Sequence, residues 1–168
     1  MRVTAISAAA ALLLLSVSTS LMAQRPDAQI DPRSIALVQE GRAAQAAGNI
    51  EGANDALESA LAVDPRNREA FVLLAEIARS RGLPGKAIRL YREALLLEPN
   101  DLAALRGQGE AMVSKGAIEK AKANLAKIKT ICTAGCNDAN VLAAAIAKGP
   151  PATVTASAEK SVTAPAKP

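Results

Sequence analysis

The feature that most constrains this chain is a unit of about 34 residues that occurs three times in succession. The clearest copy covers residues 68–101 and contains two stretches whose apolar side chains recur at three- and four-residue spacing. This spacing is typical of a helix with one buried face. We therefore predict that each unit is a pair of short amphipathic helices folded back on each other.

Turn residues and small residues keep the same register in all three copies. The aligned positions are Gly48, Gly82 and Gly116, then Ala53, Ala87 and Ala121, then Leu57, Tyr91 and Leu125. Glycine closes a helix end at little steric cost, so the three glycines should occupy equivalent turns. We expect helices at residues 32–47, 51–63, 68–81, 84–97, 102–115 and 117–130. Asp31 and Asp101 should cap two of them.

These positions resemble the tetratricopeptide repeat, written W-x2-L-G-x2-Y, then A-x3-F, then P. The first copy has Leu37, Glu40, Gly41, Ala44, Ala53, Leu57 and Pro65; the second has Phe71, Leu74, Ala75, Ala78, Ala87, Tyr91 and Pro99; the third has Leu105, Gln108, Gly109, Met112, Ala121 and Leu125. Glu40 and Gln108 replace apolar residues, tryptophan is absent, and Thr133 replaces a third proline. The resemblance covers residues 34–132 and implies an all-α, right-handed superhelical array of three helix-turn-helix repeats.

The chain ends flank this array with segments of different composition. Residues 1–23 contain Arg2 and an apolar run at 5–17, and they resemble a secretory signal peptide cleaved after Ala23. An uncleaved membrane anchor is the alternative. Residues 24–31 form a leader, 32–148 the repeat domain with a capping helix at 139–148, and 149–168 a tail rich in Pro, Ala, Thr and Lys that we predict to be disordered. We expect a periplasmic or secreted protein without stable membrane insertion.

Asn137 and Asp138 are positioned to cap the final helix, and Gly149 with Pro150 should stop it. A helix here can cover the exposed face of the last repeat, which an array needs at its end. Much of the apolar content is alanine, with one Phe, one Tyr and no Trp. The core should therefore form by close helix contact at small residues.

The sequence contains two cysteines, Cys132 and Cys136. In an exported protein, such a pair is most simply a disulfide, here joining the last repeat helix to the segment after it. A redox-active pair is the alternative, although the C-x3-C spacing differs from the C-x2-C of thioredoxin-like sites. Metal binding is disfavoured because two thiolates without histidine leave a zinc site short of ligands.

The charge pattern narrows the possible partners. Loss of residues 1–23 would remove one of 20 basic residues and none of the 16 acidic ones, so the mature chain is mildly basic. The excess of basic residues is concentrated late in the sequence, at Lys115, Lys120, Lys122, Lys127 and Lys129. These lysines form either a solvated face or a site for an acidic envelope polymer. Nucleic acid is not expected as a partner, since no aromatic platform is interleaved with them.

The sequence contains no catalytic motif. Histidine is absent, which removes the commonest general base near neutral pH, and neither a phosphate-binding glycine motif nor a nucleophile elbow occurs. We predict that the protein is not an enzyme and has no cofactor.

The resemblance implies a scaffold that holds a protein or peptide on a concave surface lined by the first helix of each pair. Projected onto this sequence, that groove comprises Val38, Arg42, Gln45, Val72, Glu76, Arg79, Arg106, Glu110 and Val113. With three repeats the groove is short, which implies a modest interface or self-association. Family members that hold the acidic C-terminus of chaperones use a clamp of lysine and asparagine. The corresponding positions here include Val38, Arg42 and Leu73, so the clamp is absent.

Overall fold

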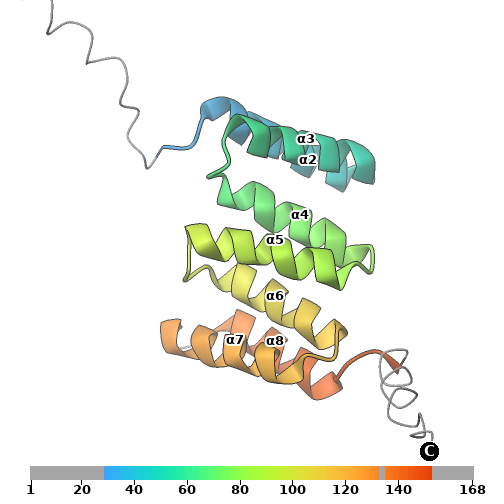
Figure 1. The fold of residues 1–168 in the computed structure, drawn as a ribbon, viewed down its shortest axis with the longest axis vertical. Coiled ribbons are helices and arrows are strands. Elements are labelled where there is room, and N and C mark those ends of the chain that lie inside the picture. Colours follow the sequence, from blue (N-terminus) through green and yellow to red (C-terminus); the bar gives the residue numbers. More distant parts are fainter. Residues whose placement is uncertain (1–28, 133–134, 153–168) are drawn as a thin grey trace, which may run out of the picture.

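The computed structural model describes residues 29–132 and 135–152, and the predicted signal peptide lies outside these ranges. Seven α-helices and no strands occur in them (Figure 1). The helices are α2 Pro32–Ala46, α3 Ile50–Val63, α4 Arg68–Ser80, α5 Pro84–Leu97, α6 Leu102–Ser114, α7 Ile118–Ile131 and α8 Asn137–Lys148. The predicted all-α repeat array is confirmed, and each predicted repeat helix matches an observed one to within one residue at either end.

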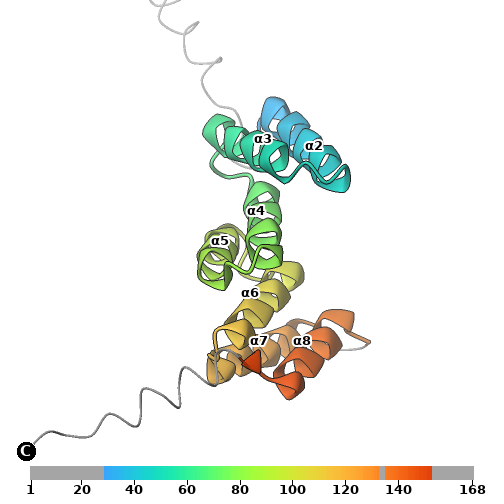
Figure 2. The same ribbon diagram turned by 90° about the vertical axis from the view of Figure 1, so that its right-hand side faces the viewer.

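Consecutive helices pack as the pairs α2–α3, α4–α5 and α6–α7, and α8 packs on both α6 and α7 as the predicted capping helix. Figure 2 shows the resulting stack from the side, with α2, α4, α6 and α8 along one side and α3, α5 and α7 along the opposite side. We call α2, α4, α6 and α8 the inner row, and α3, α5 and α7 the outer row. The array thus offers two large surfaces, one on each row.

The repeat register depends on three glycine turns. Gly48, Gly82 and Gly116 have φ angles of 76°, 69° and 77°, a left-handed conformation that a side chain would strain. Each lies between the two helices of a pair. The turns are therefore equivalent, as predicted from the repeat, and this confirms the alignment of the three copies.

Side chains cap four of the helices. Asp31 accepts a hydrogen bond from the backbone N–H of Arg33 at 2.9 Å, and Asp101 accepts one from the N–H of Ala104 at 2.9 Å, as predicted. Asn49 and Asn67 cap α3 and α4 in the same way.

The prediction for the start of α8 is wrong in detail. Asn137 is already the first residue of the helix, and Cys136 is its N-cap without a side-chain cap bond. Cys136, which is joined to Cys132, lies directly before the first residue of the helix. The predicted stop is confirmed, because Gly149 comes directly after Lys148 and has a φ angle of 76°.

The core consists mainly of small residues at helix crossings. Ala53, Ala87 and Ala121 are all fully buried, as expected for a chain with few large rings. Tyr91 is 1% exposed and points from α5 toward α6, where a Cβ at Gly107 would overlap its ring. Gly107 therefore makes room for the one tyrosine of the chain.

Gln108, one of the departures from the repeat pattern, is buried with its hydrogen bonds made. Its Nε2 donates to the Ile88 carbonyl at 3.3 Å, and its Oε1 accepts from Asn124 Nδ2 at 3.0 Å. Since a buried polar group is costly only when unpaired, glutamine is accommodated here. Glu40, the other departure, is exposed.

A polar network that the sequence analysis did not predict joins the first repeat to the second. Asp64 Oδ2 accepts from the backbone N–H of Asp31 at 2.9 Å, and Ser34 Oγ bridges the Ala60 carbonyl and Asn67 Nδ2, both at 2.8 Å. The hydrogen bond from the Arg66 side chain, followed by the backbone hydrogen bonds, lowers the pKa of Asp64 to about 2. The network links α2, α3 and α4.

Candidate functional site

The candidate site is the surface of the inner row. Three ion pairs cross this surface, and each joins neighbouring inner-row helices. Arg42 pairs with Glu69 between α2 and α4. Arg79 Nη1 lies 2.8 Å from Glu110 Oε2 between α4 and α6.

The third pair joins α6 to the capping helix. Arg106 Nε lies 3.0 Å from Asp138 Oδ1. Every contact between successive inner-row helices is therefore accompanied by an arginine bound to a carboxylate. We call these three pairs the arginine ladder.

The structure brings four predicted groove residues into the ladder, namely Arg42, Arg79, Arg106 and Glu110. Sequence reasoning missed their partners Glu69 and Asp138. The paired residues are separated by 27, 31 and 32 positions, so no constant interval marks them. Their pairing depends on how the repeats stack, which the sequence pattern alone does not define.

The three predicted groove valines lie below the surface. Val38, Val72 and Val113 are 1%, 9% and 5% exposed, and Val38 and Val72 belong to hydrophobic clusters between helices. That part of the groove prediction is corrected, because these side chains pack the inner row and offer little area to a partner. Gln45 and Glu76 are partly exposed on α2 and α4.

Tyr91 supports the middle of the arginine ladder from beneath. Burial raises the pKa of its hydroxyl to about 12, while the positive charge of the nearby Arg79 guanidinium acts in the opposite direction. Glu76 and Glu110 are also close enough to influence the pKa of this hydroxyl. Tyr91 thus reaches from an outer-row helix to the charged groups of the inner row.

A cavity of about 500 Å³ lies at the C-terminal end of the inner row. It is bordered by Arg79 on α4, Glu110 and Val113 on α6, Lys148 on α8 and residues 149–152 after α8. Since the middle ion pair forms part of its wall, the cavity and the arginine ladder belong to one site. The expected tail beyond residue 152 lies outside the described residues.

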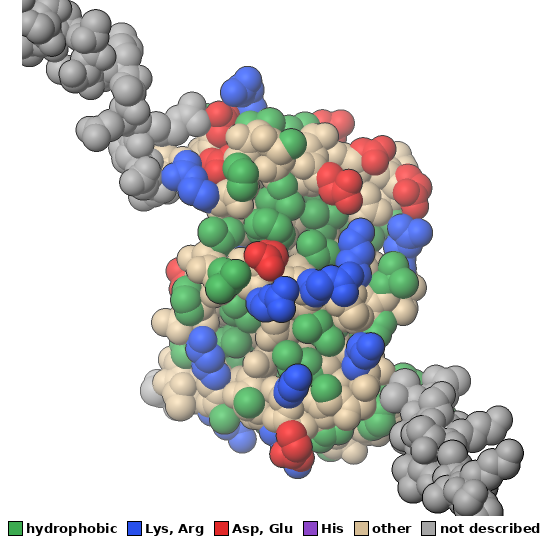
Figure 3. All heavy atoms as spheres, in the orientation of Figure 1, with side chains coloured by type: hydrophobic (Ala, Val, Ile, Leu, Met, Phe, Trp, Pro, Cys, Tyr) green, Lys and Arg blue, Asp and Glu red, His purple; other side chains and the backbone are tan. Residues whose placement is uncertain are grey.

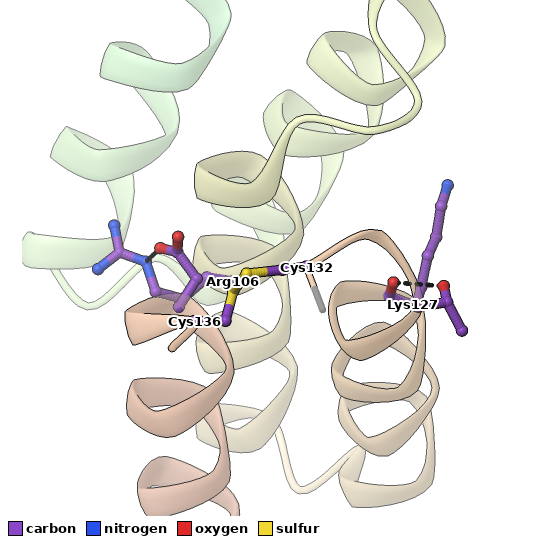
Figure 4. Close-up of a disulfide and its surroundings, with 6 residues drawn as sticks. Arg106, Lys127, Cys132 and Cys136 are labelled. Atoms are coloured by element: carbon purple, nitrogen blue, oxygen red, sulfur yellow. Dashed lines mark hydrogen bonds and ion pairs between the residues drawn. A yellow bond between two sulfur atoms is a disulfide. The ribbon is translucent and has the colours of Figure 1, made fainter. Parts of the chain in front are cut away.

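The two cysteines connect the outer row to the inner row at the start of α8. Cys132 is the C-cap of α7, Cys136 is the N-cap of α8, and their Cα atoms are 5.8 Å apart in a disulfide, a normal separation for such a bond. Figure 4 shows the bridge beside Arg106 and its carboxylate partner. The two cysteines thus lie at disulfide distance between the last repeat helix and the capping helix, in the position that the sequence predicts.

The described ranges contain neither a cluster of metal-binding side chains nor a helix suited to span a membrane. No group of three or more His, Cys, Asp or Glu side chains is arranged to hold a metal ion in residues 29–132 and 135–152. In the same part of the chain, none of the helices has the length and apolar character needed to cross a membrane.

The stacked helix pairs define an all-α helical repeat array. Residues 38–95 match the family described as "Tetratricopeptide repeat". The comparison with curated proteins gives no match.

Solved structures show the same fold. The tetratricopeptide domain of Sgt2 from Aspergillus fumigatus is 22% identical, covers 86% of this chain and is itself 93% covered, with a TM-score of 0.65. The second such domain of human RPAP3, in complex with the HSP70 peptide SGPTIEEVD, is 19% identical, with 68% and 95% coverage and a TM-score of 0.63.

A mutant O-GlcNAc transferase from Thermobaculum terrenum is 24% identical over 68% of this chain, with a TM-score of 0.62. This chain spans 22% of the length of that enzyme. The similarity therefore concerns the repeat fold.

Proposed function

We propose that this protein is an exported scaffold that holds a segment of a partner protein in the cell envelope, and that the segment lies along the inner row. The observation that carries the proposal is the arginine ladder beside a cavity of about 500 Å³. Tetratricopeptide folds are known as scaffolds for protein–protein interaction. A cavity of this size can receive one or two side chains of a docked segment.

The ladder suggests what kind of segment the groove accepts. Each arginine on the groove is matched by a carboxylate, so the surface has little net charge and should not select a strongly acidic or basic peptide. A guanidinium has five N–H donors, and one carboxylate uses at most two of them. The remaining donors of Arg42 and Arg79, whose side chains are 50% and 40% exposed, can bind backbone carbonyls of an extended segment.

The peptide complex of human RPAP3 supports the use of this fold for peptide binding. The peptide in that complex ends in Glu-Glu-Val-Asp. In this chain Val38 is buried and Arg42 is bound to Glu69. We therefore propose a partner segment of mixed charge, in a protein other than a cytosolic chaperone.

The envelope location is inferred from the composition of residues 1–23. The mass of the chain recovered from exporting cells tests this part of the proposal, because removal of the signal should leave Gln24 as the first residue. A chain recovered in the cytoplasm and starting at Met1 would contradict export.

Photocrosslinking in intact cells tests the groove. A photoreactive residue would replace Gln45 or Glu76, which lie on the groove outside the three ion pairs, and then Arg79 or Arg106. The matched control positions are Glu58 and Arg92 on the outer row. We expect the groove positions to capture one common partner that the outer positions do not reach. Capture by the outer positions alone would refute a groove function.

A further inference from the structure

The outer row has a charge gradient along the array. On α3, Glu51, Asp55 and Glu58 are the charged residues, and none of them is basic. On α5 and α7, basic residues outnumber acidic ones, with Glu93 and Glu119 as the acids. The basic residues are Lys86, Arg89, Arg92, Lys120, Lys122, Lys127 and Lys129.

We call these seven residues the basic face. Figure 3 shows the outer-row side of the molecule, with acidic side chains gathered over α3 and basic ones over α5 and α7. All seven side chains belong to exposed residues. Because the inner row is charge-balanced, the positive field of the array is concentrated on this side.

Most of this positive charge is not neutralised by other described residues. Arg92 lies 3.7 Å from Glu93 and Lys122 lies 2.8 Å from Glu119. The other five basic residues form no ion pair among the described residues. Their charge is therefore available to an anionic partner.

Exposed leucines accompany these charges at α5. Leu83 precedes the helix and is 45% exposed, while Leu96 near its end is 71% exposed. Single exposed leucines are common on protein surfaces. Here large apolar side chains flank three basic residues on one helix. The surface can therefore bind anionic groups and apolar groups together.

We propose that the basic face docks on a lipid bilayer surface rich in anionic headgroups. Basic side chains are attracted to anionic headgroups over about one Debye length, and exposed leucines can enter the boundary with the acyl chains. A soluble anionic polymer would satisfy the charges and leave the leucines in water. The acidic α3 limits docking to the α5–α7 part of the row, and the groove on the opposite side stays open to a partner.

Vesicle co-sedimentation of the exported, processed protein tests the proposal. We expect binding to vesicles containing phosphatidylglycerol, weakening as salt is raised, and no binding to phosphatidylcholine alone. Each basic residue near an anionic surface contributes about fivefold in affinity, so Lys120→Gln with Lys127→Gln should weaken binding about twenty-fivefold. Arg33→Gln, which removes one positive charge from an exposed residue of α2, is the control and should have no effect.

Leu96→Ser separates a lipid from a soluble polymer. The substitution should weaken vesicle binding severalfold and leave binding to polyglutamate unchanged. Circular dichroism checks that each variant is folded. Absence of vesicle binding, equal binding to neutral vesicles, or vesicle binding that Leu96→Ser leaves intact would overturn the proposal. Each of these outcomes is independent of the groove, whose partner capture is measured separately.

Discussion

The two rows of helices use charge in opposite ways. On the inner row, Arg79 and Arg106 are each bound to a carboxylate on the next inner-row helix. On the outer row, the charges are exposed and differ in sign between α3 and α7. Inner-row charges therefore belong to the packing of the array, and their replacement should affect stability. Outer-row charges should affect surface binding and leave stability almost unchanged.

Gly107→Val should have the largest effect, because it disturbs the point where the outer row reaches the inner one. The new side chain would overlap the ring of Tyr91, and overpacking of this kind costs about 3 kcal/mol of unfolding free energy. Urea denaturation measures the change. The control is Gly85→Ala, whose Cβ would meet no other atom and which should stabilise the helix by about 0.5–1 kcal/mol.

Removing one carboxylate from each row tests the comparison directly. Glu110 pairs with Arg79, and the Glu110 side chain is only 14% exposed. Glu110→Ala leaves Arg79 without this partner, and we expect a loss of about 2 kcal/mol of unfolding free energy. Glu119 pairs with Lys122, and the Glu119 side chain is 84% exposed. Glu119→Ala should therefore cost less than about 0.5 kcal/mol of unfolding free energy. Equal losses in denaturant would contradict the distinction between the rows.

The disulfide connects the end of the outer row to the inner one. Replacing Cys132 and Cys136 together by serine should loosen α8 by about 2 kcal/mol, since so small a ring restricts little chain entropy. Hydrogen exchange should then speed up in α8 and remain unchanged in α2 and α3. A measured reduction potential separates the structural bond from the redox-active alternative: a low potential indicates a structural bond, and a readily reduced pair indicates cycling.

Acid should weaken the junction between the first two repeats. The pKa of Asp64 is lowered to about 2 in the folded state, below its value of about 3.9 in an unfolded chain. Its contribution to stability is therefore complete above pH 4 and is lost as the pH falls toward 2. Asp64→Asn should destabilise the protein at neutral pH and flatten this part of the pH profile. An unchanged acid profile would show that the network contributes little.

Alkali should act at Tyr91. Its pKa is raised to about 12, above the value of about 10 for an unfolded chain. The stabilisation is complete below pH 10 and is lost between pH 10 and 12. Because Tyr91 is the single tyrosine, its ultraviolet absorbance follows the titration directly. A midpoint near 10 in the folded protein would contradict the buried position.

Sequence reasoning located the helices and turns because these depend on local patterns. Gly48, Gly82 and Gly116 each occupy a turn that favours glycine, and such a requirement is visible in one repeat. The predicted start of α8 at residue 139 lies two residues after the observed start at Asn137, which directly follows Cys136 of the bridge.

The groove was predicted less completely because it forms between repeats. A helical projection places Val38 on the inner row, but its depth depends on how closely the next helix packs. The partners of Arg42 and Arg106 lie on other helices at irregular sequence distances. Only the stacking of whole repeats brings them together.

The position of Tyr91 has a practical consequence for following the folding of this array. With no tryptophan in the chain, its intrinsic fluorescence comes from one ring enclosed between the second and third repeats. The first helix pair and the capping helix α8 can fray without changing that emission, since repeats contact mainly their neighbours. Melting curves recorded by fluorescence and by helical dichroism should therefore separate when the ends open first.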